Sequence, residues 1–291
     1  MLVILLWGAS AIAIKAVSAG GIVTVFYRLW FAIPLLWLFG VSSKLSQRID
    51  RVWLRSSLLG GSLFAVHQLL FFIALKLTSV ANVTIIGALQ PALVLLVAGP
   101  MFGERMTRLA LGWSMVAVVG TSMVVLGSSH AESSLIGDLL AVLNLFAFTG
   151  YFLFSKQVRG HVAPWDYMIG MTTVSGLVIL LVALASGQDF ASPSGADWMI
   201  LMLIAIFPGT IGHFLTNWAH AHASAFVISM LLLAVPVVSS AGAVVFLGES
   251  LRGAQIVGGV VVLASIAAIV AGASRGIREE LAESAAETDA P

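Results

Sequence analysis

The chain has no cysteine and very little charge. Asp, Glu, Lys and Arg together make up 9% of its 291 residues, whereas roughly 25% is usual in a soluble domain. Without cysteine, the chain cannot form disulfides, thiolate metal sites or cysteine nucleophiles. The formal net charge is only +1, so there is no basic footprint for a polyanion and we expect no nucleic-acid partner.

Apolar residues dominate the composition instead. Hydrophobic residues make up 60% of the sequence, and the mean hydropathy is +1.07. A soluble globule of this composition could not cover its surface with polar groups, which excludes an ordinary cytosolic enzyme and a disordered chain. The composition predicts an all-α integral membrane protein that crosses the lipid bilayer many times.

Ten runs are long and apolar enough to cross a bilayer, for which a helix needs about 20 residues. They are Leu2–Ala19, Val23–Val41, Ser56–Leu75, Val80–Gly99, Leu109–Gly127, Leu135–Phe154, Tyr167–Ala185, Trp198–Ala219, Ala223–Leu247 and Ala254–Gly272. Barrel strands alternate apolar and polar residues, and these runs do not, so we expect ten transmembrane helices. The first run lacks a preceding basic segment and a clear cleavage site, which favours a mature helix over a signal peptide.

The distribution of Lys and Arg predicts the orientation of the spans. On one side of the membrane, the loops and the C-terminal tail carry Lys44, Arg48, Arg51, Arg55, Arg105, Arg108, Lys156, Arg159, Arg275 and Arg278. The opposite side carries only Lys76 and Arg252. Because positively charged loops stay in the cytoplasm, we expect both termini there, in a multi-pass protein of the plasma membrane or bacterial inner membrane.

The chain contains an internal repeat. Gln90-Pro91-Ala92-Leu93 runs on to Phe102-Gly103-Glu104, and Val235-Pro236-Val237-Val238 runs on to Leu247-Gly248-Glu249. Pro91 and Pro236 are 145 residues apart, as are Glu104 and Glu249. We therefore divide the chain into two five-helix repeats, 1–130 and 131–273, and a polar cytoplasmic tail, 274–291. An odd number of spans per copy inverts the second copy in the membrane, an arrangement that transporters use for alternating access.

These residues resemble the EamA family of the drug/metabolite transporter superfamily. Each copy has a proline in its fourth helix and Gly-Glu about a dozen residues later, and the first helix carries Trp7-Gly8 and Lys15. The resemblance implies ten spans in two five-helix copies and a transporter, most often an exporter of small metabolites. The sequence has no P-loop, so ATP is not expected to drive the cycle, and we expect no cofactor.

Polar side chains inside the spans are candidates for a substrate site, because they are costly in lipid and usually face the bundle interior. His67 and Gln68 lie in the third span, and His213 and Asn217 share one face of the eighth. We expect these four to line a cavity, although they could instead join helices by hydrogen bonds. The candidate aromatic walls, which could also face lipid, are Trp7, Phe71, Tyr151 and Trp218.

Arg28 is the remaining candidate substrate contact. It lies about six residues inside the second span, where it either attracts a substrate carboxylate or phosphate or snorkels to the interface. For Lys15, near the end of the first span, we expect snorkelling. Pro91 and Pro236 occupy equivalent helices and are candidate hinges for gating, with a static kink as the alternative.

None of the thirteen acidic residues falls in the middle of a span, although many coupled carriers use a buried carboxylate. Transport is therefore expected to be uncoupled or proton-linked through His67 or His213. An embedded enzyme would need a nucleophile with an oriented base, and a channel would need a filter. We recognise neither and expect no catalytic residues. His220 and His222 lack a third ligand, so no metal site is expected.

Together these features predict a secondary-active or facilitative transporter that works by alternating access. The lack of a basic cluster argues against sugar phosphates and nucleotides. It favours export of amino acids or similar small neutral or zwitterionic compounds. Export of drugs and import of another metabolite class stay open as alternatives. Ten spans suffice for a self-contained carrier, so a monomer would function, while the sequence leaves the oligomeric state open.

Overall fold

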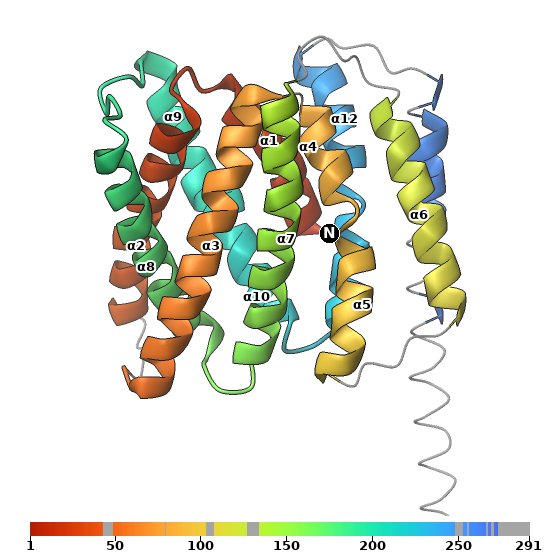
Figure 1. The fold of residues 1–291 in the computed structure, drawn as a ribbon, viewed down its shortest axis with the longest axis horizontal. Helices are drawn as coiled ribbons and strands as arrows, with labels where there is room; N and C mark the ends of the chain where they lie inside the picture. The colour runs from red at the N-terminus through yellow and green to blue at the C-terminus, as the bar shows by residue number, and fades with distance from the viewer. Residues whose placement is uncertain are drawn as a thin grey trace, which may run out of the picture.

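The computed structural model describes residues 1–42, 49–78, 80–102, 108–126, 134–247, 253–254, 256–265, 267–268 and 271–272. Every regular element in these ranges is a helix. The helices are α1 Leu2–Ala16, α2 Gly21–Ser42, α3 Arg51–Leu77, α4 Val80–Gly87, α5 Gln90–Phe102, α6 Arg108–Leu126, α7 Leu135–Val158, α8 Pro164–Ala185, α9 Gly195–Ile204, η1 Ala205–Gly212, α10 His213–Ala219, α11 Ala225–Leu232 and α12 Val235–Leu247. Figure 1 shows the long helices side by side with nearly parallel axes. Glu104, Glu249 and the tail 274–291 lie outside the described residues.

Five helical segments are long and apolar enough to cross a membrane. They are Gly21–Gly40, Arg51–Leu77, Leu135–Val158, Pro164–Ala185 and Gly195–Ala219. Shorter apolar helices cover Leu2–Ala16, Leu111–Gly120, Ala225–Ser239 and Ile256–Ser265. The all-helical, strongly apolar architecture agrees with the composition and is that of a membrane protein.

Two predicted spans are broken rather than continuous. The run Val80–Gly99 forms α4 and α5, and the run Ala223–Leu247 forms α11 and α12. Pro91 and Pro236 are the second residues of α5 and α12. A proline has no N–H for the carbonyl four residues earlier, so one helix ends before it and the next begins. The bounds of α4 and α5 recur 145 residues later in α11 and α12.

The eighth predicted span is irregular in a different way. It consists of α9, η1 and α10, and η1 is a π-helix of eight residues that contains Pro208. The Thr210 hydroxyl donates to the Ala205 carbonyl, five residues earlier, over 2.8 Å. The wider winding lets the helix continue past its proline. Segments of this kind are frequent at functional sites.

Close helix contacts depend on glycine. A Cβ atom on Gly61 of α3 would lie 2.6 Å from Val174 Cβ of α8, and one on Gly8 of α1 would lie 2.5 Å from Val238 Cγ1 of α12. The Ser239 hydroxyl also donates to the Gly8 carbonyl over 2.8 Å. In lipid, apolar surface gives no drive for helices to associate, so close backbone approach between small residues contributes to packing.

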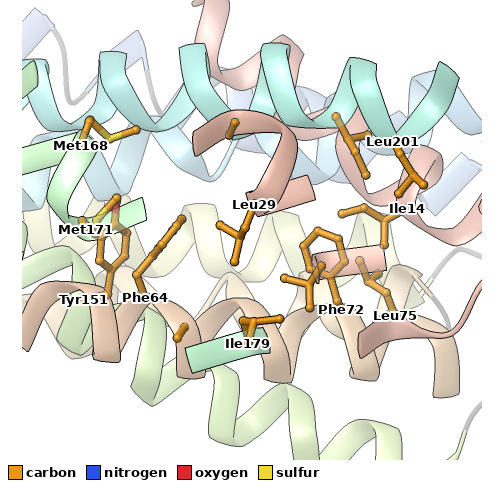
Figure 2. Close-up of a cluster of buried hydrophobic side chains, with 14 of the residues drawn as sticks. Ile14, Leu29, Phe64, Phe72, Leu75, Tyr151, Met168, Met171, Ile179 and Leu201 are labelled. Carbon is orange, nitrogen blue, oxygen red and sulfur yellow. The ribbon is translucent and has the colours of Figure 1, made fainter. Parts of the chain in front are cut away.

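Apolar side chains fill the centre of the bundle and also cover its outside. Figure 2 shows part of the buried cluster, in which Leu29, Phe64 and Ile179 belong to different helices. On the outer surface, Leu38 is 71% exposed and Phe246 is 79% exposed. Soluble proteins avoid large apolar surfaces of this kind, whereas a lipid environment favours them.

Two lysines donate hydrogen bonds to the turns that precede α4 and α11, which occupy equivalent positions in the two halves of the chain. Lys15 Nζ at the end of α1 donates to the Thr78 carbonyl over 2.7 Å. Lys156 Nζ at the end of α7 donates to the Ala223 carbonyl over 2.8 Å and to the His220 carbonyl over 3.0 Å. Thr78 and Ala223 are 145 residues apart and come just before α4 and α11. Lys15 is therefore engaged by the backbone, where the sequence suggested snorkelling.

Candidate substrate-binding site

A cavity of about 140 Å³ lies among the helices. A water molecule needs roughly 10–15 Å³ of such volume, so there is room for about ten water-sized groups. Both helix breaks and the π segment reach it, through Pro91, Pro236 and Pro208. Eight of the residues singled out in the sequence line it: Trp7, Arg28, His67, Gln68, Phe71, Pro91, His213 and Pro236.

His67 is held in an aromatic wall by α7. Its Nδ1 lies 2.7 Å from Asn144 Oδ1, and because an amide oxygen only accepts, Nδ1 carries the proton and donates. The His67 ring lies parallel to that of Tyr151, with centroids 6.0 Å apart, and 4.7 Å from that of Phe148. The imidazole is thus fixed in tautomer and orientation at the cavity surface.

His213 is held from the other side of the same wall. Its ring centroid lies 4.8 Å from that of Trp7 and 4.7 Å from that of Phe64. Its Nδ1 lies 3.3 Å from the Tyr151 hydroxyl, which also accepts a hydrogen bond from Asn217 Nδ2 over 3.3 Å. Tyr151 and Asn217 are buried but do not line the cavity. They support His213 from behind rather than forming the surface that we expected of them.

Trp218 lies away from these residues. Its side chain is 47% exposed, and its ring stacks on that of His222 with centroids 4.1 Å apart. Trp218 does not line the cavity, in contrast to its predicted role as an aromatic wall. Among the described residues, no group of three His, Cys, Asp or Glu could hold a metal ion.

The π segment is joined to the first half of the chain by two cavity residues. The Trp7 indole donates to the Pro208 carbonyl over 3.2 Å, and Arg28 Nη2 donates to the Gly209 carbonyl over 3.1 Å. Gly209 is needed here, because a Cβ atom on it would lie 2.8 Å from Arg28 Nε. Arg28 is only 3% exposed and does not snorkel to the interface.

Several polar lining residues escaped the sequence reasoning: Ser10, Thr84, Gln90, Asn144 and Ser229. Gln90 is the most informative of them, since it is 2% exposed and its Nε2 has no hydrogen-bond partner among the described residues. The sequence did offer a signal, because Gln90 directly precedes the hinge candidate Pro91. Asn144 could have been noticed as the polar residue in the middle of the sixth predicted span.

Two curated relatives are similar in sequence. Over 177 residues the chain is 26% identical to a "Probable amino-acid metabolite efflux pump" of Salmonella typhimurium; the match covers 57% of this chain and only 59% of that protein. It is 22% identical over 246 residues to the "Pseudopaline exporter CntI" of Pseudomonas aeruginosa, with 84% of each protein covered. A solved structure, described only as "Crystal structure of protein", has the same fold, with a TM-score of 0.77 and 19% identity over 92% of this chain and 95% of that one.

The family model of the EamA-like transporter family matches residues 1–126 and again residues 135–271. The two matches take in nearly all of the described helices, including those that line the cavity. They bear out the resemblance carried by Trp7-Gly8 and by the prolines of the two broken helices. The chain belongs to the EamA-like transporter family.

Proposed function

We propose that this transporter exports small neutral or zwitterionic metabolites, in particular amino acids, by alternating access. The observation that carries the proposal is the cavity, which is lined by both broken helices and by the π segment. Transporters place substrate sites where helices are discontinuous. The names of the two relatives, an amino-acid metabolite efflux pump and a pseudopaline exporter, support export of small metabolites. Drug export and import of another metabolite class are the alternatives.

The architecture that we propose is ten transmembrane helices in two inverted repeats, 1–130 and 131–273, followed by a cytoplasmic tail, 274–291. Three observations support it. The family model matches the chain twice. The bounds of the broken helices recur after 145 residues. The lysine contacts to Thr78 and Ala223 recur at the same spacing.

The membrane setting follows from the same proposal. We assign both termini to the cytoplasm and the protein to the bacterial inner membrane, supported by the excess of Lys and Arg on one side of the predicted spans. Ten helices enclosing their own cavity are enough for a monomer to transport, so no second copy is required.

Within the cavity, the proposed substrate contacts are Trp7, Arg28, His67, Gln68, Phe71 and His213. Pro91 and Pro236 are the proposed hinges, because Gly87 and Leu232 end α4 and α11 at the cavity and their carbonyls find no N–H on the proline four residues later. Among the lining residues that the structure describes there is no Asp or Glu, so a proton-linked cycle would depend on His67 or His213.

Counterflow in proteoliposomes tests the function. Vesicles preloaded with pooled unlabelled amino acids, sugars or nucleosides receive traces of labelled ones outside. A carrier accumulates label from one class in a saturable manner, whereas a channel does not saturate and an enzyme changes the solute. No accumulation from any pool by monodisperse protein would contradict the proposal. In the His67→Ala, His213→Ala double variant, unchanged dependence on a pH gradient would exclude proton coupling through histidine.

A further inference from the structure

Arg28 is the one Lys, Arg, Asp or Glu side chain among the described residues that line the cavity. Its Nη2 donates to the Gly209 carbonyl over 3.1 Å, and its Cζ lies 5.3 Å from the centroid of the Phe64 ring. A guanidinium has five N–H donors, and Nη2–Gly209 is its only side-chain hydrogen bond within the described part of the chain. The remaining donors are available to an occupant of the cavity.

The charge on Arg28 has no carboxylate partner in the part of the chain that the structure describes, and the described lining residues include no Asp or Glu. An ion held away from water without a partner costs several kcal/mol, as a rule, and persists where it serves a function. Phe64 and the Gly209 carbonyl offset only part of that cost, because a ring face and a single dipole are weaker partners than a carboxylate.

We propose that Arg28 binds the carboxylate of the transported substrate, and that the substrates are small carboxylates with an apolar body. The bidentate geometry of an arginine–carboxylate pair suits this position. Apolar groups for the substrate body are at hand in Phe71, Phe72 and Leu232, which line the same cavity. This inference rests on the proposed export of small metabolites and names the group by which they are recognised.

The lining residues offer different partners to the carboxylate and to the ammonium of an amino acid. Its carboxylate meets a full positive charge at Arg28. Its ammonium meets only neutral acceptors among the described lining residues, including Gln68, Thr84 and Ser229. Loss of the carboxylate therefore weakens binding much more than loss of the ammonium does.

Binding at Arg28 also affects the π segment. The same guanidinium joins η1 to α2 through the Gly209 carbonyl, and its remaining donors are enough for a bidentate carboxylate beside that bond. A bound substrate would therefore share one side chain with the π segment. Occupancy of the cavity is in this way linked to the contact between η1 and the first half.

The test compares derivatives of L-leucine and L-phenylalanine as competitors in counterflow, using the reconstituted full chain and whichever labelled solute accumulates. Each amino acid is tested beside its amide, which lacks the carboxylate, and its 2-oxo acid, which lacks the ammonium. We expect the amides to compete at least 10-fold more weakly than the acids, and the 2-oxo acids to stay within a few-fold of them.

Substitutions at Arg28 and Trp7 separate recognition from packing. Arg28→Gln should bring the acids down to the level of the amides, and Arg28→Lys should give an intermediate ratio because it keeps the charge. Trp7→Phe also removes one hydrogen bond to η1 but no charge. Because Trp7 is itself a proposed substrate contact, this variant should weaken binding of acids and amides alike and so preserve the acid-to-amide ratio.

Amides that compete as well as acids would overturn the inference. An acid-to-amide ratio in Arg28→Gln that equals the ratio in the parent protein would overturn it too, whether or not the ratio in Arg28→Lys is also unchanged. Saturable counterflow of an uncharged solute that no carboxylate inhibits would also overturn it and would leave the proposed carrier function intact. Absence of counterflow with every pool would contradict the proposed function and the inference with it.

Discussion

Gly8→Ala should destabilise the protein through a clash between α1 and α12. The new Cβ would lie 2.5 Å from Val238 Cγ1 and 2.7 Å from Val238 Cβ, whereas ordinary contacts begin at 3.4 Å. Rotation of the valine moves Cγ1 but not Cβ, so the helices must separate by about 0.7 Å to bring the 2.7 Å contact to 3.4 Å. Such overpacking costs about 1–3 kcal/mol. The same shift stretches the 2.8 Å bond from Ser239 to the Gly8 carbonyl, which costs about 1 kcal/mol more.

The measurement is the apparent Tm of detergent-purified protein, with aggregation followed by size exclusion. At roughly 2–4 °C per kcal/mol, we expect Gly8→Ala to lower Tm by several degrees. Gly112→Ala in α6 is the matched control, because a Cβ there meets no atom within 4 Å and alanine favours a helix by about 1 kcal/mol. Adding Val238→Gly removes the Cβ that the new alanine meets. Its effect on Tm should therefore be more favourable in Gly8→Ala than in the parent protein. Equal Tm values for Gly8→Ala and Gly112→Ala would refute the reasoning.

Four further variants probe other features. Lys156→Met removes the hydrogen bonds to the His220 and Ala223 carbonyls and should lower the free energy of unfolding by about 1–3 kcal/mol. An unchanged Tm would mean that these bonds do not stabilise the turn before α11. Burial, with the positive charges of Lys156 and Arg159 adding to it, lowers the pKa of His220 to about 3. The unfolded chain then binds the proton at a higher pH than the folded protein does, so the stabilisation present above pH 6.5 is lost as the pH falls toward 3, at about 1.4 kcal/mol per pH unit. His220→Leu should therefore reduce the change in Tm between pH 7.5 and pH 5. A plot of Tm against pH that runs parallel to that of the parent protein would contradict this. Gln90→Leu should change the free energy of unfolding by no more than about 1 kcal/mol, since Gln90 Nε2 has no partner to lose within the described residues. It should still weaken substrate binding in counterflow, because Gln90 lines the cavity. Asn144→Ala should lower Tm by leaving His67 Nδ1 without its acceptor.

Hydropathy was enough to predict which long runs form helices. α2, α3, α7, α8 and the segment Gly195–Ala219 each begin and end within five residues of the predicted bounds. Hydropathy did not predict the breaks in the fourth and ninth runs, because an apolar run has the same hydropathy whether or not its helix is interrupted; the sequence marked Pro91 and Pro236 only as hinges or kinks. Pro91 and Pro236 carried the signal, since proline removes a hydrogen bond that hydropathy does not count.

The site was predictable in part. A polar residue in an apolar run is readily noticed, and this signal identified His67, Gln68 and His213 as candidates. All three line the cavity. Which face such a residue presents depends on partners far away in the chain, as with His67 and Asn144, which are 77 residues apart. Asn217 shares a helix face with His213 but supports Tyr151 behind the wall, a distinction that spacing along one helix cannot make.

The π winding of η1 also determines how insertions and deletions would act on this transporter. A π-helix holds more residues per turn than an α-helix, so deleting one residue from Ala205–Gly212 is absorbed when the segment rewinds as an α-helix. Later residues then stay close to their present faces, whereas the same deletion in an ordinary α-helix turns every later residue by about 100°. The cost falls on the segment itself, because the carbonyls of Pro208 and Gly209 move away from Trp7 and Arg28. A deletion here should therefore spare the rest of the helix and damage the cavity, whereas surface loops tolerate such changes.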